Sequence, residues 1–422
     1  MAGPGTTRFE IAIAGASHTG LALALALRAM LGSGVRIALL DREPILQPAA
    51  RKPDPRAFAL SEGSRRLLAA LGVWERLSPS PQPVSSIDIT DSSLTHASRP
   101  VLLHYDNRTA DGAVATYIVE AEVLRRAMAE RVGAADSIEC LPRATVSAFS
   151  DGGGGVRIEL ADGTALTSEL LVAADGGSSR VRQAAGIKCV AWSTGQVGIV
   201  TTIVHEKPHA GRAVQNFLPG GPFAMLPLSG NRSCVTWSEE RDAGRSIVEG
   251  DDARFRSELE RRLDYRLGRI ERIGPRALWP LEFRIARTLI GSRLALAGDA
   301  ARTVHPIAGQ GLNLALRDVA ALAECVADAV RVGLSAGDVT ALERYELWRR
   351  FDAASSAAVY AALNAVFSND WTLARAARSA GLGLVDRAAG IKSLLVLEAA
   401  GLTGDLPRLM QGSAAISPAA VG

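Results

Sequence analysis

Residues 9–41 read FEIAIAGASHTGLALALALRAMLGSGVRIALLD, and this stretch decides the fold. Its first part, Phe9 to Ala14, is an apolar run of strand type, and Gly20 to Leu31 is rich in alanine and leucine, which favour helix. A second apolar run, Val35 to Leu40, stops at Asp41. The order of these runs predicts a strand–helix–strand unit whose strands are parallel and whose crossover is right-handed.

The turn between the first strand and the helix runs from Gly15 to Gly20 and reads GASHTG, which matches the dinucleotide-binding pattern GxGxxG at two of its three glycines. Backbone N–H groups of such a turn, with the N-terminus of the following helix, can hold a pyrophosphate. Asp41, at the end of the second strand, is placed to accept hydrogen bonds from ribose hydroxyls. The hexad alone is weak evidence, because the chain contains 41 glycines, and a tight turn without a ligand remains the alternative.

Ser17 occupies the position of the middle glycine in this pattern. A Cβ atom there crowds an approaching phosphate, whereas the hydroxyl could donate a hydrogen bond to a phosphate oxygen. We expect His18 to be a solvent-facing turn residue and not a catalyst.

Two further strand-like runs end beside an acidic residue. LLVAA at 170–174 precedes Asp175, and LALA at 294–297 leads to Asp299. After the second of them, residues 309–311 (GQG) open a predicted helix whose amide groups could meet negative charge. Open α/β sheets bind ligands at the carboxyl ends of their strands, so these runs and the first strand predict a common site.

The rest of the chain divides into blocks of different character. β-Branched runs between Gly, Pro and Asn turns, at 84–104 and 197–238, predict antiparallel strands. Residues 53–60 are expected to form a loop, and residues 61–71 a helix with Ser61 as its N-cap.

From Asp318 onward the pattern is almost wholly helical. Because strand-rich blocks interrupt the α/β material, we expect an α/β fold in which a nucleotide-binding domain is assembled from separated segments around an inserted domain. The expected boundaries are 1–80, 111–190 and 285–335 for the nucleotide-binding domain, 81–110 and 191–284 for the sheet-based substrate domain, and 336–422 for a C-terminal helical region.

The composition is that of an ordinary globular protein, with 48% hydrophobic and 22% charged residues among 422. The 47 Lys and Arg residues exceed the 44 Asp and Glu residues by only 3, so no nucleic-acid partner is expected. A pI near 8.8 permits contact with an anionic membrane surface. No uncharged stretch is long enough to span a membrane and no leader peptide is expected, so we predict a cytoplasmic protein.

Neither the cysteines nor the histidines predict a metal site. The four cysteines lie tens of residues apart and form no CxxC pair, which argues against zinc and against a disulfide framework. His205 and His209 have the i,i+4 spacing of metal ligands on a helix, but Pro208 between them argues against a helix.

Five segments carry a family resemblance. They are DPRAFALSEGSRRLLAALGVWERL at 54–77, YIVEAEVLRRAM at 117–128, ADGGSSRVRQAAGI at 174–187, NFLPGGPFAMLPL at 216–228 and AGDAARTVHPIAGQGLNLALRDVAALAE at 297–324, with further likeness at 344–350, 367–370 and 381–387. Together they resemble the FAD-dependent aromatic hydroxylases, which are class A flavoprotein monooxygenases with the para-hydroxybenzoate hydroxylase fold. Within that class the chain is most similar to the ubiquinone-biosynthesis hydroxylases, and the likeness covers most of the chain.

The resemblance implies a Rossmann-like FAD-binding domain with an inserted antiparallel-sheet substrate domain and a C-terminal helical region. The residues implied to bind FAD are Gly15, Ser17 and Gly20 at the pyrophosphate, Asp41 at the adenosine ribose, Arg125 at the phosphates, Arg56 beside the flavin, Asp175 and Gly176 in a motif shared by flavin hydroxylases, Asp299 at the ribityl chain, and Pro306, Gly309, Gly311, Leu312 and Asn313 around the flavin ring. The residues implied to act in catalysis are Arg56, His305, Pro306, Gly309 and Gln310. His305 either faces the substrate or caps its loop.

The resemblance also implies the chemistry. Reduced flavin and O₂ would form a C4a-hydroperoxide that hydroxylates an electron-rich ring, with NAD(P)H or an external donor as a transient reductant. The implied substrate is a membrane-resident polyprenyl phenol or quinol, which implies peripheral contact with the inner membrane and with other quinone-biosynthesis proteins.

Two alternatives stay open at this point. A monooxygenase of the same fold could act on a soluble aromatic compound. A non-catalytic, FAD-free lipid-binding or scaffold member of the family is also consistent with the serine at position 17.

Overall fold

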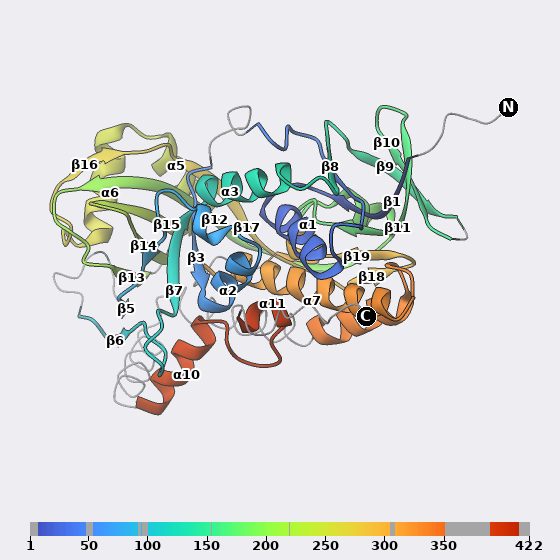
Figure 1. Ribbon diagram of the computed structural model, residues 1–422. Helices are drawn as coiled ribbons and strands as arrows, with labels where there is room; N and C mark the ends of the chain where they lie inside the picture. The colour runs from blue at the N-terminus through green and yellow to red at the C-terminus, as the bar shows by residue number, and fades with distance from the viewer. Residues whose placement is uncertain are drawn as a thin grey trace.

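The computed structural model describes residues 7–47, 54–91, 94, 100–152, 154–218, 220–303, 309–350 and 389–412. The strands of these residues form sheets of eight, nine and three strands. The eight-stranded sheet and its helices occupy one half of the molecule (Figure 1). The nine-stranded sheet occupies the other half with α5 (Arg241–Glu249) and α6 (Asp252–Leu263).

The eight-stranded sheet carries the predicted nucleotide turn. Its strands are β1 (Thr7–Ala14), β2 (Ile37–Asp41), β8 (Ile138–Pro142), β9 (Val146–Asp151), β10 (Val156–Leu160), β11 (Ala165–Ala173), β18 (Ile290–Gly291) and β19 (Leu294–Leu296). The strands β8, β2, β1, β11 and β19 are neighbours in that order, and all of these pairs are parallel. The carboxyl ends of four of them, β2, β1, β11 and β19, therefore meet along one edge, which confirms the expected convergence of the strand ends.

Helix α1 (His18–Leu31) forms where the alanine- and leucine-rich run predicted it, and it contacts both α3 (Ala121–Gly133) and α7 (Gly311–Arg331). Most of its side chains are buried, because neighbours cover it on several sides. Residues 339–350 are helical as well, and the hydroxyl of Tyr345 there donates a hydrogen bond to the carbonyl oxygen of Leu296 at 2.8 Å. The C-terminal part of the chain thus supports the end of β19.

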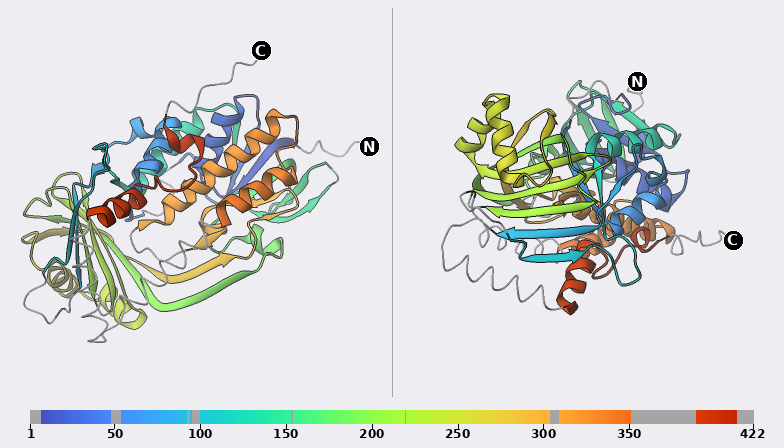
Figure 2. Two further views of the ribbon diagram at one scale, coloured as in Figure 1. Left: turned by 90° about the horizontal axis from the view of Figure 1, so that it is seen from below. Right: turned by 90° about the vertical axis from the view of Figure 1, so that its left-hand side faces the viewer.

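The nine-stranded sheet has the order β20, β17, β12, β15, β14, β13, β5, β6, with β16 beside β12. Its strands are β5 (Ser86–Asp91), β6 (Leu103–Asp106), β12 (Cys189–His205), β13 (Arg212–Leu218), β14 (Gly221–Leu228), β15 (Arg232–Glu240), β16 (Ile270–Ile273), β17 (Ala277–Ala286) and β20 (Arg302–Thr303). The long strands β12 and β17 connect the two halves of the molecule (Figure 2). One face packs on α5 and α6 through large buried rings, including Phe223, Trp237 and Phe255.

One pairing in this sheet differs from the prediction. The strands at 84–104 and 197–238 were expected to be antiparallel, and most are, but β5 and β13 run parallel. Such a pair needs a long connection, and here the chain passes through β7 to β11 and the helices α3 and α4 of the other half before it returns to this sheet. Local turn signals carry no information about a pairing across that distance.

The prediction of a loop over 53–60 was wrong for its second half, because Ala57–Ser61 forms β3. This strand pairs with β7 (Thr116–Glu120), which also pairs with the short β4 (Gln82–Pro83). The partner of β3 lies far along the chain, so the strand depends on tertiary pairing and not on its own propensity. The predicted N-cap is confirmed: Ser61 Oγ accepts a hydrogen bond from the N–H of Ser64 at the start of α2 (Glu62–Ala70).

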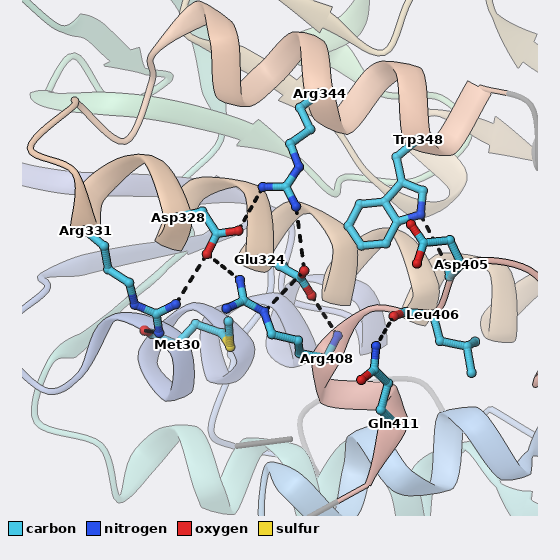
Figure 3. A network of polar contacts seen from close by, with 10 residues as sticks. All are labelled: Met30, Glu324, Asp328, Arg331, Arg344, Trp348, Asp405, Leu406, Arg408 and Gln411. Carbon is cyan, nitrogen blue, oxygen red and sulfur yellow. Dashed lines mark hydrogen bonds and ion pairs between the residues drawn. The ribbon is translucent and has the colours of Figure 1, made fainter. Parts of the chain in front are cut away.

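The last described residues form α10 (Ala389–Ala399) and α11 (Arg408–Gln411), which lie against the rest of the molecule. Figure 3 shows how α11 is held: Arg408 bonds both Glu324 and Asp328 of α7, and its N–H donates to Glu324 at 2.7 Å. Arg344 contributes a second cation to Asp328 at 2.8 Å. This paired cluster fixes the chain after α10 to α7.

No described helix is both long and apolar enough to cross a membrane.

We predict that Gly20→Ala destabilises the fold. A Cβ at position 20 would lie 1.8 Å from the carbonyl oxygen of Gly15, so α1 must move away from the end of β1. The free energy of unfolding should fall by about 3 kcal/mol. Gly34→Ala is the matched control, because a Cβ there meets no atom within 4 Å. Thermal unfolding followed by circular dichroism compares the two, and equal midpoints would contradict the close packing described here.

Candidate active site

The carboxyl edge of the eight-stranded sheet opens into a cavity of about 1600 Å³. At this edge the cavity is lined by residues from four strand ends, Gly15, Asp41, Asp175 and Asp299. The same cavity continues over one face of the nine-stranded sheet, where most lining side chains are apolar. A polar groove and an apolar chamber are therefore one continuous space.

The nucleotide turn depends on glycine at one position and tolerates serine at another. Gly15 has a φ of 102°, and a Cβ there would lie 2.4 Å from the carbonyl oxygen of Ala174. Ser17, the N-cap of α1, has a φ of −85°, which any residue adopts without strain. Its exposed side chain lines the cavity. The backbone thus accommodates the serine that motivated the FAD-free alternative.

The N-terminus of α1 faces this cavity through Ser17, His18 and Thr19. Its first turn contains no acidic side chain, and the Ser17 side chain makes no capping hydrogen bond. The first amide groups of a helix have no acceptor within the helix, so this end presents N–H donors and the positive end of the helix dipole. That combination suits a pyrophosphate.

Asp41 joins the end of β2 to the turn. Its Oδ2 accepts a hydrogen bond from the N–H of Ala16 at 2.6 Å, and its Oδ1 accepts one from the N–H of Glu43 at 2.8 Å. The carboxylate still lines the cavity. It is therefore held in place by the backbone and remains accessible to hydroxyl donors of a ribose.

His18 was expected to face solvent, and this prediction was wrong. Its side chain is buried, and Nε2 donates a hydrogen bond to the carbonyl oxygen of Ala121 at 2.9 Å. The ring also meets Phe58 edge to face. Burial lowers the pKa of His18 to about 4, so the imidazole is neutral at physiological pH. His18 therefore fixes α1 to the start of α3 as an uncharged group.

Asp175 bonds the start of the short helix α4 (Arg180–Ala184), whose N-cap is Ser179. Its Oδ2 accepts a hydrogen bond from the N–H of Arg180 at 2.8 Å. Its Oδ1 is buried and has no hydrogen-bond partner among the described residues, although the residue lines the cavity. Gly176 follows with a φ of 87°, a conformation that favours glycine. The pair turns the chain at the cavity wall and leaves one carboxylate oxygen for a donor.

Asp299 lies just after β19, in the turn η3 (Gly298–Ala300), and lines the cavity. Its side chain is exposed to solvent within this cavity. Burial raises the pKa of Asp299, and the nearby cations Arg56 and Arg302 offset this rise only in part. A ligand that donates hydrogen bonds to this carboxylate would stabilise its charged form.

A buried ion cluster fixes the same turn. The carboxylate of Asp318 accepts a hydrogen bond from the N–H of Gly298 at 3.3 Å. It also accepts hydrogen bonds from Arg302 and Arg349, each at 2.8 Å, and all three side chains are almost fully buried. The residue before Asp299 is thus anchored to α7 and to the helical residues 339–350. The sequence analysis did not assign Asp318 a role.

Arg56 lies where the groove meets the chamber. It makes a bidentate pair with Asp54, at 2.9 Å from Nε and 2.6 Å from Nη2. Its guanidinium carbon lies 5.3 Å from the ring centre of Trp279 and 5.6 Å from that of Phe58. Burial opposes its charge, but the pair with Asp54 and the proximity of Asp299 give a net rise in the pKa of Arg56. Arg56 is therefore a fixed cation in the cavity wall, and Asp54 is a supporting residue that sequence reasoning missed.

Arg125, on α3, does not line the cavity. It is buried and bonds Glu122 at 3.0 Å. Its Nη1 is buried without a partner among the described residues. The structure thus places Arg125 behind the nucleotide turn, with one donor unused.

The loop before α7 brings a second helix N-terminus to the cavity. Gly309 has a φ of 63°, and a Cβ there would lie 3.2 Å from the side chain of Ala59. Gln310 is the N-cap of α7, and it lines the cavity with Gly309, Gly311 and Leu312. The first turn of α7 contains no acidic side chain, so its free amide groups can meet negative charge on a ligand.

Asn313 is in the same turn but does not line the cavity. Its Oδ1 accepts a hydrogen bond from the N–H of Ser61 at 2.9 Å, and its Nδ2 donates to the carbonyl oxygen of Ala59 at 2.8 Å. The residue therefore ties β3 to the start of α7. His305 and Pro306 lie outside the described residues.

His205 and His209 do not form a metal site. His205 contacts Lys207 and Ser233 through its two ring nitrogens, and His209 contacts the backbone of Leu228 and Gly211. The rings meet at a centroid distance of 5.8 Å, but all four nitrogens are engaged. Over the described ranges, no group of three or more metal-binding side chains occurs.

Sequence reasoning also missed the floor of the chamber. One row of cavity-lining residues crosses six neighbouring strands in register: Leu103, Ile89, Gln215, Ala224, Thr236 and Val200. The alternation of apolar and polar residues in these strands indicates that the two faces of the sheet differ. It does not indicate that one face lies opposite the carboxyl edge of the eight-stranded sheet. A long-range register decides that, and no local pattern encodes it.

The cavity fits FAD on several independent observations. Two helix N-termini without acidic side chains face it, and the turn at Gly15 leaves no room for a Cβ. Buried polar atoms at the wall lack partners among the described residues, namely Asp175 Oδ1 and Thr303 Oγ1. Unsatisfied buried groups are costly unless a ligand completes them. The donors and acceptors of an extended dinucleotide meet this need.

Comparison with known proteins agrees with this geometry. The family model described as FAD binding domain matches residues 8–355. The chain is 38% identical over 406 residues to the ubiquinone hydroxylase UbiL of Rhodospirillum rubrum, covering 96% of this chain and 92% of that protein. It is 31% identical to the 3-demethoxyubiquinol 3-hydroxylase of Escherichia coli, covering 93% and 98%. The p-nitrophenol 4-monooxygenase PnpA of Pseudomonas putida shares the fold, with a TM-score of 0.77 at 19% identity over 94% of this chain and 100% of that one.

We predict that Asp299→Asn stabilises the apoprotein and weakens FAD binding. Because the pKa of Asp299 is raised in the folded protein, ionisation of this carboxyl lowers the free energy of unfolding. The loss is complete above the folded pKa and absent well below the ordinary value of 3.8. The variant's unfolding midpoint should therefore exceed that of the wild type at pH 7, and the difference should shrink as the pH falls toward 4. The Kd for FAD should rise about tenfold, because a charged acceptor is lost. Thermal unfolding across pH and titration with FAD measure both effects, and a lower midpoint at pH 7 would refute the assigned cost.

Proposed function

The chain belongs to the FAD-dependent hydroxylase family that includes the ubiquinone-biosynthesis hydroxylases, and we propose that it hydroxylates the aromatic ring of a polyprenylated phenol in ubiquinone biosynthesis. The observation that carries the proposal is the continuity of the dinucleotide groove with an apolar chamber. A ring with a hydrocarbon tail suits such a chamber better than a small charged compound does.

When bound, FAD supplies the redox chemistry that activates O₂. The overall reaction places one oxygen atom of O₂ on the ring and releases the other as water. The two electrons come from NAD(P)H or from an external donor, which binds only transiently.

The protein's own part is to bind and to orient. We assign the N-terminus of α1 and the turn at Gly15 to the pyrophosphate, Asp41 to the ribose of adenosine and Asp299 to the ribityl hydroxyls. The N-terminus of α7, at Gly311 and Leu312, is assigned to the electron-rich edge of the flavin. Each assignment rests on the donor or acceptor that the residue presents to the cavity.

Arg56 is assigned to the junction between the two ligands. It is a permanent cation, oriented by Asp54 and by the ring of Trp279. A fixed guanidinium at this place can stabilise negative charge that develops on a phenol oxygen or on the flavin. The apolar floor beyond it excludes water, which would otherwise divert the activated oxygen to peroxide.

The substrate class also bears on where the protein works. A polyprenyl phenol resides in a membrane, so we propose that the protein contacts the inner membrane at its periphery and meets other quinone-biosynthesis proteins there. The surplus of basic residues is consistent with an anionic lipid surface.

We predict that the FAD-loaded protein, given NAD(P)H, O₂ and a prenylated phenol, forms a product that carries one additional oxygen atom. With ¹⁸O₂ the label should appear on the ring, as mass spectrometry can show. The Gly15→Val variant should bind no FAD and give no product, because its Cβ collides with the backbone at Ala174. Conversion of unprenylated phenols alone would favour a soluble substrate, and a wild-type protein that binds no FAD would remove the enzyme assignment.

A further inference from the structure

We propose that the outer end of the chamber, between β5, β6 and α10, binds the polyprenyl tail of the substrate and is the place where this tail leaves the protein. The proposal rests on the proposed function, because it takes the prenylated ring as given. It adds which residues receive the tail and in which direction the tail runs.

The direction follows from the order of strands in the nine-stranded sheet. Trp279 on β17 lies beside Arg56, at the end of the chamber that meets the polar groove. From there the lining crosses β12, β15, β14, β13 and β5 and ends at Leu103 and Tyr105 on β6. Neighbouring strands lie about 4.8 Å apart, so the floor from β12 to β6 is about 24 Å wide. That width exceeds an aromatic ring and leaves room for several isoprene units.

The chemistry of the floor changes along this path. Gln215 and Thr236 provide polar groups in the middle of the row. Beyond them, Ile87, Ile89 and Leu103 form an apolar surface on β5 and β6. Hydrocarbon gains free energy from burial only against such a surface. The polar head of a prenylated phenol therefore matches the inner part, and its tail matches the outer part.

Helix α10 forms one wall of the outer end. Val396 and Ala400 pack with Tyr105 and Ala115 in a small core, and Lys392 donates a hydrogen bond to the carbonyl oxygen of His104 at 2.8 Å. From the same helix, Glu398 and Ala399 line the cavity. The outer wall of the chamber thus comes from the last part of the described chain.

The cavity reaches the protein surface at this wall. Glu398 is exposed and also lines the cavity, from which we infer that the cavity opens to solvent beside it. One helical turn earlier, Leu394 is 64% exposed and lies on the same side of α10. An apolar residue just outside the mouth continues the hydrophobic path beyond it.

Contacts with α2 and α7 fix the end of α10, on the side away from the chamber. The N–H of Gly63 on α2 donates a hydrogen bond to the carbonyl oxygen of Ala400 at 2.9 Å, and a Cβ at position 63 would lie 2.8 Å from the carbonyl oxygen of Gly401. Farther on, the cluster of Arg408 with Glu324 and Asp328 holds the chain after α10 (Figure 3). These contacts fix the position of the outer wall, and with it the opening of the chamber.

Two variants that narrow the outer chamber from opposite sides test the proposal. Leu103→Trp adds bulk on the floor, and Ala399→Phe adds bulk on the wall. Val101→Trp is the matched control, because Val101 is 41% exposed and does not line the cavity. All three are compared with the wild type on phenols with a single prenyl unit and with several prenyl units. Turnover is measured, and also the Kd of an unreactive long-tailed phenyl ether, by calorimetry on the FAD-loaded protein.

We expect both narrowing variants to lose at least tenfold in kcat/KM and in affinity for the long-tailed compounds. Their activity on the single-prenyl phenol should stay within about twofold of the wild type, which also shows that they fold. Equal losses on short and long tails, or no loss on either, would overturn the tail subsite while leaving the hydroxylase assignment intact. A wild-type protein that accepts no prenylated phenol would overturn the proposed function itself, and the subsite with it.

Discussion

The parallel ladder of β2, β1, β11 and β19 is the constraint on which the rest of the structure depends. Hydrogen bonds between these strands fix their register, so their carboxyl ends lie along one edge. Gly15, Asp41, Asp175 and Asp299 come from places up to 284 residues apart in the chain, yet all line one cavity. The cofactor groove is a direct result of strand order.

Buried charge makes this edge rigid. Asp318 receives two guanidinium groups and one backbone N–H in the core, and it thereby links η3, α7 and the helical residues 339–350. An unpaired carboxylate in that position would cost about 3–5 kcal/mol, so the pairs hold the surrounding chain in one arrangement. Asp299, by contrast, has cations nearby but no such enclosure of donors, and its charge remains costly until a ligand satisfies it. Asp318 therefore stabilises the turn at η3, whereas Asp299 in the same turn presents its carboxylate to the cavity.

Much of the nucleotide half could be predicted from the sequence, because its signals are local. The apolar runs, the glycine turn and the acidic strand ends gave the βαβ unit and the cavity-lining positions. The predicted exposure of His18 was wrong, because the residues around position 18 do not indicate that the backbone of α3 packs over its ring. Asn313 and Arg125 were expected to bind FAD, and this stays a prediction. The hydrogen bond between Asn313 and Ser61 joins segments 252 residues apart, which no local pattern encodes, whereas Arg125 bonds Glu122 three residues earlier on the same helix. The parallel pair of β5 and β13 and the continuous floor of the chamber are likewise long-range features.

The position of α10 has a consequence for how the protein is made. The floor strands β5 and β6 leave the ribosome early, whereas the wall that completes the chamber follows the whole nine-stranded sheet in the chain. The apolar floor therefore has no outer wall until α10 has been synthesised, and exposed apolar surface on a partly folded chain favours aggregation.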